Sequence, residues 1–285
     1  MIYILYNPIS NNKMGEGVKA ELESFFSGKE LSFSDVREIK DYKAFFEKVS
    51  DEDKVILAGG DGTLNHFVND VYDLNITQQV LYYPSGSGND FAHDVENSEK
   101  VDGKFIVLNE FIKSLPEVSV NGIKKRFING IGYGIDGYCC EVGDEMREKS
   151  DKPVNYAGIA IKGLLGKFHP SNATVTIDGK SYSYKNVWLA PSMIGKYYGG
   201  GMMVAPAQDR LNAEKTLSLV VWANRSKLGT LCAFPSIFKG EHIKHTKMIT
   251  IFTGHDIKVQ FDKPQALQID GETVKKVSEY SVSYR

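Results

Sequence analysis

The sequence contains little cysteine, no excess of either charge and no long apolar run. Only three of its 285 residues are cysteines, two of them adjacent at Cys139 and Cys140, and no CxxC pair occurs. This pattern excludes a disulfide miniprotein and favours a reduced compartment without a structural zinc site. The 34 basic and 36 acidic residues leave a formal net charge of −2, so no basic field attracts nucleic acid. No run approaches the roughly 18 apolar residues that span a bilayer, and we expect a cytoplasmic protein.

The first part of the chain alternates strand and helix patterns. Hydrophobic residues make up 42% of the sequence, as in ordinary globular proteins, and the length suggests about two domains. In the predicted first domain, residues 1–116, short apolar runs alternate with segments that have apolar residues at helical spacing. Strands are expected at residues 2–6, 54–58 and 80–83, and helices at about 15–26, 41–49 and 64–71. The alternation predicts a parallel sheet with crossover helices.

The second part, residues 117–285, has a different pattern. Its candidate strands are short and separated by turn signals such as Asp178-Gly179 and Asp262-Lys263-Pro264. Only two helices stand out, at about 153–167 and 227–238. The sequence therefore predicts a mostly antiparallel β-domain in this part of the chain.

The most informative segment, GGDGTLN at residues 59–65, lies where a predicted strand becomes a helix. Glycines there let backbone N–H groups approach an anion, and the start of a helix adds partial positive charge. Asp61 has the wrong charge for direct phosphate contact, but it fits a Mg²⁺ ion lying between carboxylate and phosphates. The alternative interpretation is a tight turn in which Asp61 caps a helix.

Two more polar turns follow predicted strands. PSGSGNDFA at residues 84–92 again leads from a strand into a helix and supplies Asp90, and Asn7 to Asn11 follows the first strand. Ligands of open α/β sheets bind at the carboxyl ends of the strands, so three such turns indicate one phosphate-binding edge. Neither the Walker motif nor the dinucleotide fingerprint is present.

Taken together, the motifs resemble the diacylglycerol kinase catalytic family. They are NPIS at 7–10, GGDGTLN at 59–65, PSGSGNDFA at 84–92, NGIGYGID at 129–136, GGGM at 199–202 and DGE at 270–272. The family includes bacterial soluble lipid kinases and is similar to the sphingosine and ceramide kinases. GGDGT alone is shared with NAD kinases and phosphofructokinases, whereas the joint set is much more specific.

The resemblance implies an N-terminal three-layer α/β nucleotide-binding domain, a β-sandwich lipid or substrate domain, and an active site in the cleft between them. It implies ATP as phosphoryl donor and Mg²⁺ as cofactor. Asp61 and Asp90 match an acidic network around the metal, and Glu272 matches the general base that takes the proton of the lipid hydroxyl. The segments that match nucleotide contacts contain Asn7, Pro8, Ile9, Ser10, Asn11, Gly59, Gly60, Asp61, Gly62, Thr63, Leu64, Asn65, His66, Ser85, Gly86 and Ser87.

The sequence departs from the family pattern at two places. Glu117 stands near the position of a family aspartate, and it is a candidate substitute. The usual Asp-Gly of a structural metal site is missing, so that Glu214, with the carbonyls of Leu211 and Thr216, takes its place by register. Asp136 either joins the acidic network or caps a helix.

We predict an ATP- and Mg²⁺-dependent kinase for the hydroxyl of diacylglycerol or a related lipid. The alternatives are a sphingoid, isoprenoid or NAD acceptor, or an inactive nucleotide-sensing module. The basic and apolar segment 225–247 indicates either a transient contact with the membrane surface or an ordinary amphipathic helix. His242 and His245 indicate a metal site or a solvated basic face. A homodimer is one alternative for the oligomeric state.

Overall fold

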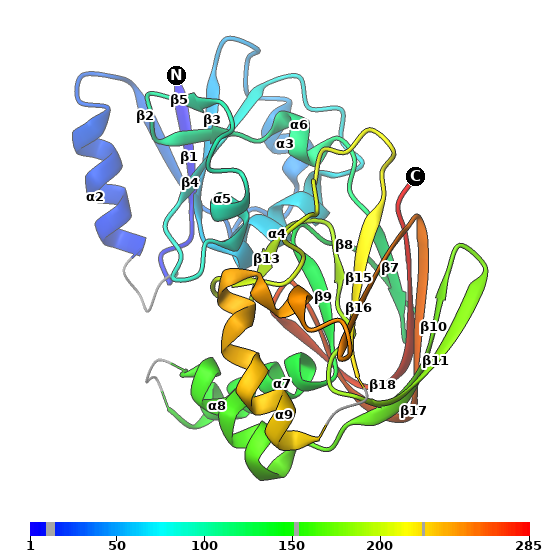
Figure 1. Ribbon diagram of the computed structural model, residues 1–285. Helices are drawn as coiled ribbons and strands as arrows, with labels where there is room; N and C mark the ends of the chain where they lie inside the picture. Colours follow the sequence, from blue (N-terminus) through cyan, green and yellow to red (C-terminus); the bar gives the residue numbers. More distant parts are fainter. Residues whose placement is uncertain (10–14, 151–153, 224–225) are drawn as a thin grey trace. The chain divides into compact units, whose positions relative to one another are not determined.

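The protein is described here by a computed structural model that defines residues 1–9, 15–150, 154–223 and 226–285. The chain divides into two compact units, Met1–Leu115 (unit 1) and Pro116–Arg285 (unit 2). Figure 1 shows the elements of both.

Unit 1 contains a six-stranded mixed sheet in the order β2-β1-β3-β4-β6-β5. The strands β1 (Ile2–Tyr6), β2 (Leu31–Asp35), β3 (Lys54–Gly59) and β4 (Gln79–Pro84) are parallel. The sequence pattern predicts the parallel order of β1, β3 and β4, whereas it misses β2. The strands β5 (Lys100–Val101) and β6 (Phe105–Val107) form an antiparallel hairpin at the edge, which the sequence pattern did not reveal. Asp102 and Gly103 have φ of 51° and 69°, which suits a tight hairpin turn.

Helices cover both faces of this sheet. Leu22 of α2 (Gly15–Phe25) packs against Ile4 and Ile56 on one face. Because successive strand residues point to opposite faces, Tyr3 lies on the other face, where its ring is 5.7 Å from Phe45 of α3. The unit therefore has three layers, in which α3 (Tyr42–Phe46) packs on α4 (Asp61–Val71). Two short helices, α5 (Asp90–Asp94) and α6 (Asn109–Ile112), follow the strands β4 and β6 along the chain.

Unit 2 is a mostly antiparallel β-sandwich. Its main sheet runs in the order β16-β15-β12-β9-β17-β18-β7-β8, and β10 pairs with β11 and β17. The first of these strands along the chain are β7 (Glu117–Val120), β8 (Ile123–Arg126), β9 (Gly130–Tyr133), β10 (Ser171–Ile177) and β11 (Lys180–Val187). They are followed by β12 (Ser192–Met193), β15 (Leu217–Trp222), β16 (Ile249–Gly254), β17 (Asp256–Ile269) and β18 (Glu272–Ser283).

The long strand β17 connects the two halves of the sandwich. Its first half pairs with β10 and its second half pairs with β9. The predicted turn at Asp262-Lys263-Pro264 is wrong, because the strand continues through it with register shifts. A bulge tolerates the missing N–H of a proline, which explains how the strand passes this point.

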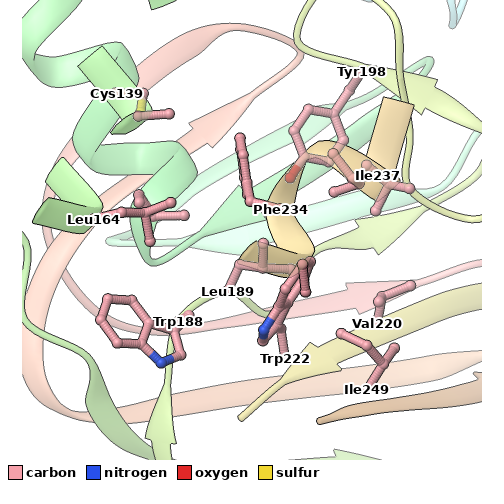
Figure 2. Close-up of a cluster of buried hydrophobic side chains, with 14 of the residues drawn as sticks. Cys139, Leu164, Trp188, Leu189, Tyr198, Val220, Trp222, Phe234, Ile237 and Ile249 are labelled. Atoms are coloured by element: carbon pink, nitrogen blue, oxygen red, sulfur yellow. The ribbon is translucent and has the colours of Figure 1, made fainter. Parts of the chain in front are cut away.

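The helices of unit 2 surround a second core, shown in Figure 2. Trp188, Trp222, Phe234 and Leu164 lie in this core, almost completely buried. The helical segments are α7 (Ile135–Lys149), α8 (Tyr156–Lys162), the π-helical turn η1 (Gly163–Lys167), α9 (Lys227–Ala233) and the 3₁₀ turns η2 (Phe234–Lys239) and η3 (Glu241–Lys244). The sequence pattern missed α7. Across the described ranges, no helix is both long and apolar enough to cross a membrane.

Candidate active site

The first candidate segment is the turn between β3 and α4. Gly60 is the N-cap residue of α4 and, as a glycine, supplies no side-chain cap to the helix. A Cβ on Gly59 would lie 2.5 Å from the Cβ of Thr63, so this turn has no room for a side chain. The first N–H groups of a helix lack intrahelical partners and carry partial positive charge. The eleven-residue helix α4 therefore presents its positive end at the turn.

The two glycine turns of unit 1 lie against each other. A Cβ on Gly86 would lie 2.4 Å from the Cα of Gly60, and the Ser85 N–H donates to the Gly59 carbonyl at 2.9 Å. Glycine at position 86 makes this close backbone approach possible. The Oγ of Ser85 is buried and has no hydrogen-bond partner within the described residues.

Asn89 closes the second turn. Its Oδ1 accepts from the N–H of Gly86 at 3.0 Å, and its Nδ2 donates to the Gly86 carbonyl at 2.9 Å. Asn89 has φ of 52°, a conformation that asparagine tolerates better than most residues. The turn is thereby fixed, and Ser87 is exposed at its tip.

The carboxylate of Asp61 connects these two turns. It accepts hydrogen bonds from the backbone N–H groups of Asp90 at 3.0 Å and Phe91 at 2.9 Å. Asp61 thus caps α5, the helix that follows the second turn. Asp90 itself is buried.

Asn7 links the end of β1 to α4. Its Nδ2 donates to Oγ1 of Thr63 at 3.3 Å, and its Oδ1 accepts from the N–H of Ile9 at 3.1 Å. Pro8 lines a hollow of ≈ 670 Å³ above the ends of β1 and β2. Ser10 and Asn11 lie outside the described residues.

Charged residues that sequence reasoning did not single out line this hollow. They are Glu16, Lys19, Asp35, Arg37 and Glu38. The hydrogen bond from Arg37 lowers the pKa of Asp35, and Lys19 Nζ lies 5.3 Å from the centre of the Phe33 ring. Because the hollow is lined by three acidic and two basic side chains, it favours a ligand with hydroxyl groups over a free phosphate. Asp35, Arg37 and Glu38 lie outside the motifs, and the pairing of β2 with β1 brings them to the end of β1.

The remaining residues of the GGDGTLN segment face in different directions. Gly62 and His66 are exposed, and no atom lies within 4 Å of a Cβ built on Gly62. The side chains of Leu64 and Asn65 are buried in unit 1. We expect the buried pair to support the turn rather than to touch a ligand.

In unit 2, the turn between β17 and β18 is built on Asp270 and Gly271, with φ of 46° and 92°. The Asp270 carboxylate accepts from the N–H groups of Ile128 at 2.6 Å and of Asn129 and Gly130 at 2.9 Å each. The same loop is held by the buried guanidinium of Arg210, which donates to the Ile128 carbonyl at 2.7 Å. Asp270 therefore fixes the position of the residue that begins β18.

That residue is Glu272, whose carboxylate accepts a hydrogen bond from Lys125 of β8. The Lys125 side chain is largely buried, whereas that of Glu272 is partly exposed. Asn121 in the β7–β8 turn donates to the Lys275 carbonyl at 3.3 Å, which holds this hairpin against β18. Sequence reasoning did not identify Lys125.

Glu117, the candidate substitute for a family aspartate, lies in the same hairpin. Its carboxylate is 3.3 Å from Lys124 Nζ and 3.4 Å from Arg126, its partner across the β7–β8 pair. These two cations balance the negative charge of Glu117 within unit 2.

Asp136, predicted either to join the acidic network or to cap a helix, makes its described hydrogen bond inside unit 2. It lies in the first turn of α7, buried, and its carboxylate accepts a hydrogen bond from the Tyr198 hydroxyl. Tyr198 belongs to β13 (Tyr197–Tyr198), which pairs with β14 (Met202–Met203) around the glycines of the GGGM motif. Burial raises the pKa of Asp136 to about 7.

The loop predicted to hold a structural metal is closed by amide side chains. The Thr216 carbonyl accepts from Gln208 Nε2 at 2.9 Å and from Asn212 Nδ2 at 3.0 Å. Glu214 and Leu211 are exposed. Over the described ranges, no group of three His, Cys, Asp or Glu side chains is arranged to hold a metal ion. These contacts do not fit a cation at this loop.

The basic segment 225–247 folds as α9, η2 and η3, and Arg225 lies outside the described residues. Phe234 and Ile237 are buried in the core, as in an ordinary amphipathic helix, whereas Leu228 and Phe238 are exposed. The buried His242 bonds through Nε2 to the Val204 carbonyl at 2.9 Å and stacks on Trp222, while His245 is exposed. The two histidines thus do not form a metal pair.

Two family models match the chain, one over each part. The diacylglycerol kinase catalytic domain matches residues 1–116, and the YegS C-terminal NAD kinase beta sandwich-like domain matches residues 129–282. Together they define the class of the fold, a diacylglycerol kinase catalytic domain followed by an NAD kinase-like β-sandwich domain. The chain belongs to the diacylglycerol kinase catalytic-domain family, which confirms the resemblance in the sequence motifs.

Curated relatives agree with this family. A Mycobacterium tuberculosis protein named diacylglycerol kinase is 25% identical over 70% of this chain, and the chain spans 64% of that protein, less than two thirds. Staphylococcus aureus and Staphylococcus epidermidis proteins of the same name are 26% and 25% identical, each over 94% of this chain and over 85% and 84% of their own lengths.

Solved structures show the same fold. A diacylglycerol kinase from Bacillus anthracis superposes with a TM-score of 0.60 at 17% identity, and the match covers 99% of this chain and 93% of that one. A second structure from the same organism gives a TM-score of 0.67 at 18% identity, over 100% of this chain and 92% of the other. The predicted fold class, α/β followed by a β-sandwich, is confirmed.

Proposed function

We propose that the protein is an ATP-dependent kinase that phosphorylates the hydroxyl of diacylglycerol or a related lipid. The observation that carries the proposal is the close approach of Gly60 and Gly86 beside the start of α4. Family membership and the names of the relatives support a kinase with an alcohol acceptor. Peripheral contact with a membrane surface follows from a lipid acceptor.

The phosphates of ATP are assigned to the glycine turns. The first N–H groups of a helix lack intrahelical acceptors, and a helix start favours anions. The buried Oγ of Ser85 supplies a further hydroxyl without a partner among the described residues. The nucleoside is assigned to the hollow above β1 and β2, where carboxylates such as Asp35 can accept from ribose hydroxyls.

The residues present fit a magnesium ion that arrives with the nucleotide. Mg²⁺ usually keeps several waters and is held by one or two carboxylates together with phosphate oxygens. Asp61 and Asp90 are the carboxylates next to the glycine turns, and a carboxylate oxygen can accept from more than one partner. When bound, Mg²⁺ neutralises charge on the transferred phosphoryl group.

Glu272 is assigned as the general base for the acceptor hydroxyl. The Asp270-Gly271 turn fixes the backbone before it, and Lys125 orients its carboxylate. An ammonium group next to a carboxylate favours the ionised form, which is the form that can accept a proton. Lys125 is thus a positioning residue for the base.

A phosphoryl-transfer screen with labelled ATP tests the function. The acceptors are diacylglycerol, ceramide, phosphatidylglycerol, undecaprenol and NAD, with the lipids in mixed micelles. Transfer to diacylglycerol in excess of the other acceptors is the expected result. ATP binding without transfer to any acceptor would show a nucleotide-sensing module instead.

The variant Glu272→Gln tests the base. It keeps size and hydrogen bonding but removes basicity, so we expect kcat to fall by roughly 10²-fold or more while the Kd for ATP stays the same. Glu279→Gln, on the same strand, is the matched control, because Glu279 pairs at the surface with Lys258. A parallel loss of ATP affinity would make Glu272 a ligand of the nucleotide or metal.

A further inference from the structure

Arg210 lies in the connection between β14 and β15 of unit 2, and it is only 6% exposed. Burying a cation costs free energy unless hydrogen bonds replace the water that it loses. The guanidinium donates from Nη1 to the Ile128 carbonyl at 2.7 Å and from Nη2 to Asn129 Oδ1 at 3.1 Å. Its planar fork thus holds a backbone acceptor and a side-chain acceptor of one segment, residues 128–130, which we call the 128–130 segment.

Asn129, the first residue of the NGIGYGID motif, is buried and is held from several sides. Its carbonyl accepts from the N–H groups of Ile194 at 3.1 Å and Gly195 at 3.2 Å, while its side chain accepts from the guanidinium. A Cβ built on the next residue, Gly130, would lie 2.4 Å from Met193 Sδ, so the backbone is packed closely there. The position of this segment is therefore narrowly defined within unit 2.

The 128–130 segment is the part of the chain that binds the Asp270 turn. The Asp270 carboxylate accepts from all three N–H groups of the segment, and the Asp270 N–H donates back to the Gly130 carbonyl at 3.0 Å. Glu272 begins β18 directly after this turn, where it pairs with Ile269 of β17. A chain of hydrogen bonds thus leads from the guanidinium through the segment to the turn that carries Glu272.

We propose that Arg210 is a positioning residue for Glu272, which acts by holding the 128–130 segment against the Asp270 turn. The proposal rests on the proposed function, in which Glu272 takes the proton of the acceptor hydroxyl. A general base must lie within hydrogen-bond reach of its proton, and a displacement of about 1 Å can lower a rate by roughly 10²-fold. A lysine at position 210 would keep the charge but lose the fork, so it could not hold both acceptors in the same geometry.

Phosphoryl transfer to diacylglycerol in mixed micelles tests the proposal, with Arg210→Lys made in the full wild-type chain and in Glu272→Gln. In the wild type, Arg210→Lys should lower kcat by about tenfold or more, while the Kd for ATP stays the same. In Glu272→Gln, it should change kcat by less than about twofold, because residues that act through one group have non-additive effects. Equal fold-losses in the two backgrounds would overturn the proposal.

Gln208→Met is the matched control, because Gln208 is buried in the same connection but bonds to the Thr216 carbonyl and to Ser218 Oγ. It should leave kcat unchanged, and a loss equal to that of Arg210→Lys would show a general effect of this connection and refute the proposal. Asn129→Ala removes one acceptor of the guanidinium and keeps the backbone of the segment. It should lower kcat in the wild type but not in Glu272→Gln, and the opposite result would contradict the positioning role even if Arg210→Lys does not fold.

Amide hydrogen exchange of the 128–130 segment separates this proposal from the proposed function, because it does not depend on turnover. In Arg210→Lys the three amides should exchange about tenfold faster or more, while the amides of β3 in unit 1 exchange as in the wild type. Gln208→Met should leave the segment unchanged. Wild-type exchange of the segment in Arg210→Lys would overturn the positioning role. Faster exchange in a protein that phosphorylates no acceptor would refute the kinase proposal and still show that Arg210 holds the segment.

Discussion

Each unit presents an aspartate next to a glycine, and in both the carboxylate accepts backbone hydrogen bonds from a second segment. In unit 1, Asp61 accepts from two N–H groups at the start of α5. In unit 2, Asp270 accepts from three N–H groups of the loop before β9. Asp61 and Asp270 thus both hold a backbone segment in place through the contacts that they make.

The difference between the units lies in what stands beside each aspartate. Next to Asp61 is the N-terminal end of α4, whereas next to Asp270 is the carboxylate of Glu272 with Lys125. We infer that unit 1 offers main-chain groups suited to an anion, and that unit 2 offers a side chain suited to a proton. A motif aspartate can therefore support the chemistry by fixing the neighbouring group.

A third motif aspartate, Asp136, differs from these two in its surroundings, and it gives the largest expected effect on stability. Asp136 is buried beside the Tyr198 hydroxyl, and burial raises its pKa from 3.8 to about 7. At pH values between 3.8 and about 7, the folded state therefore keeps this proton, whereas the unfolded state has lost it. The free energy of unfolding should fall by about 4 kcal/mol from this group as the pH rises from about 4 to 7.

The measurement is chemical unfolding across this pH range. Asp136→Asn keeps the hydrogen bond to Tyr198 but cannot ionise. Its free energy of unfolding should therefore not fall between pH 4 and 7, and it should exceed that of the wild type at pH 7 and above. The same slope in the variant would assign the pH dependence to other groups.

Asp270→Ala should have the next largest effect, a loss of about 3 kcal/mol, because three backbone N–H groups lose an ionised acceptor. Asp178→Ala is the control, since this exposed carboxylate accepts from two N–H groups, those of His255 and Asp256. It should cost about 1 kcal/mol. Urea unfolding measures both, and equal losses would contradict the special role of the Asp270 turn.

The motifs predicted the fold class because each one requires a particular local backbone geometry. The turn after β3 needs glycine, and the parallel order of β1 to β4 follows from strands alternating with helices. The sequence could not place Lys125 or Arg37, because their partners are set by strand pairing and by the sheet order. Nor could it show that Asp61 caps α5, a contact 29 residues away in the chain.

Asp61→Ala should cost about 2 kcal/mol of stability in the absence of ATP and Mg²⁺, because α5 loses the cap over its first two N–H groups. The control is Asp41→Ala, which removes the cap of α3 formed with the Ala44 N–H at 3.0 Å and should cost about 1 kcal/mol. Thermal unfolding measures both. Unchanged stability in Asp61→Ala with abolished transfer would assign Asp61 to the metal alone.

The smallest effect concerns the loop where the sequence suggested a structural metal. Asn212 Oδ1 accepts from the Thr216 N–H at 2.8 Å, and together with Gln208 its amide nitrogen occupies the Thr216 carbonyl. We therefore expect EDTA to leave the Tm unchanged and Glu214→Gln to have no effect, whereas Asn212→Ala should cost about 1 kcal/mol because the loop loses its amide contacts. Differential scanning calorimetry with and without EDTA checks all three. A lower Tm in EDTA that Glu214→Gln reproduces would show that a cation, and not the amide pair, holds this loop.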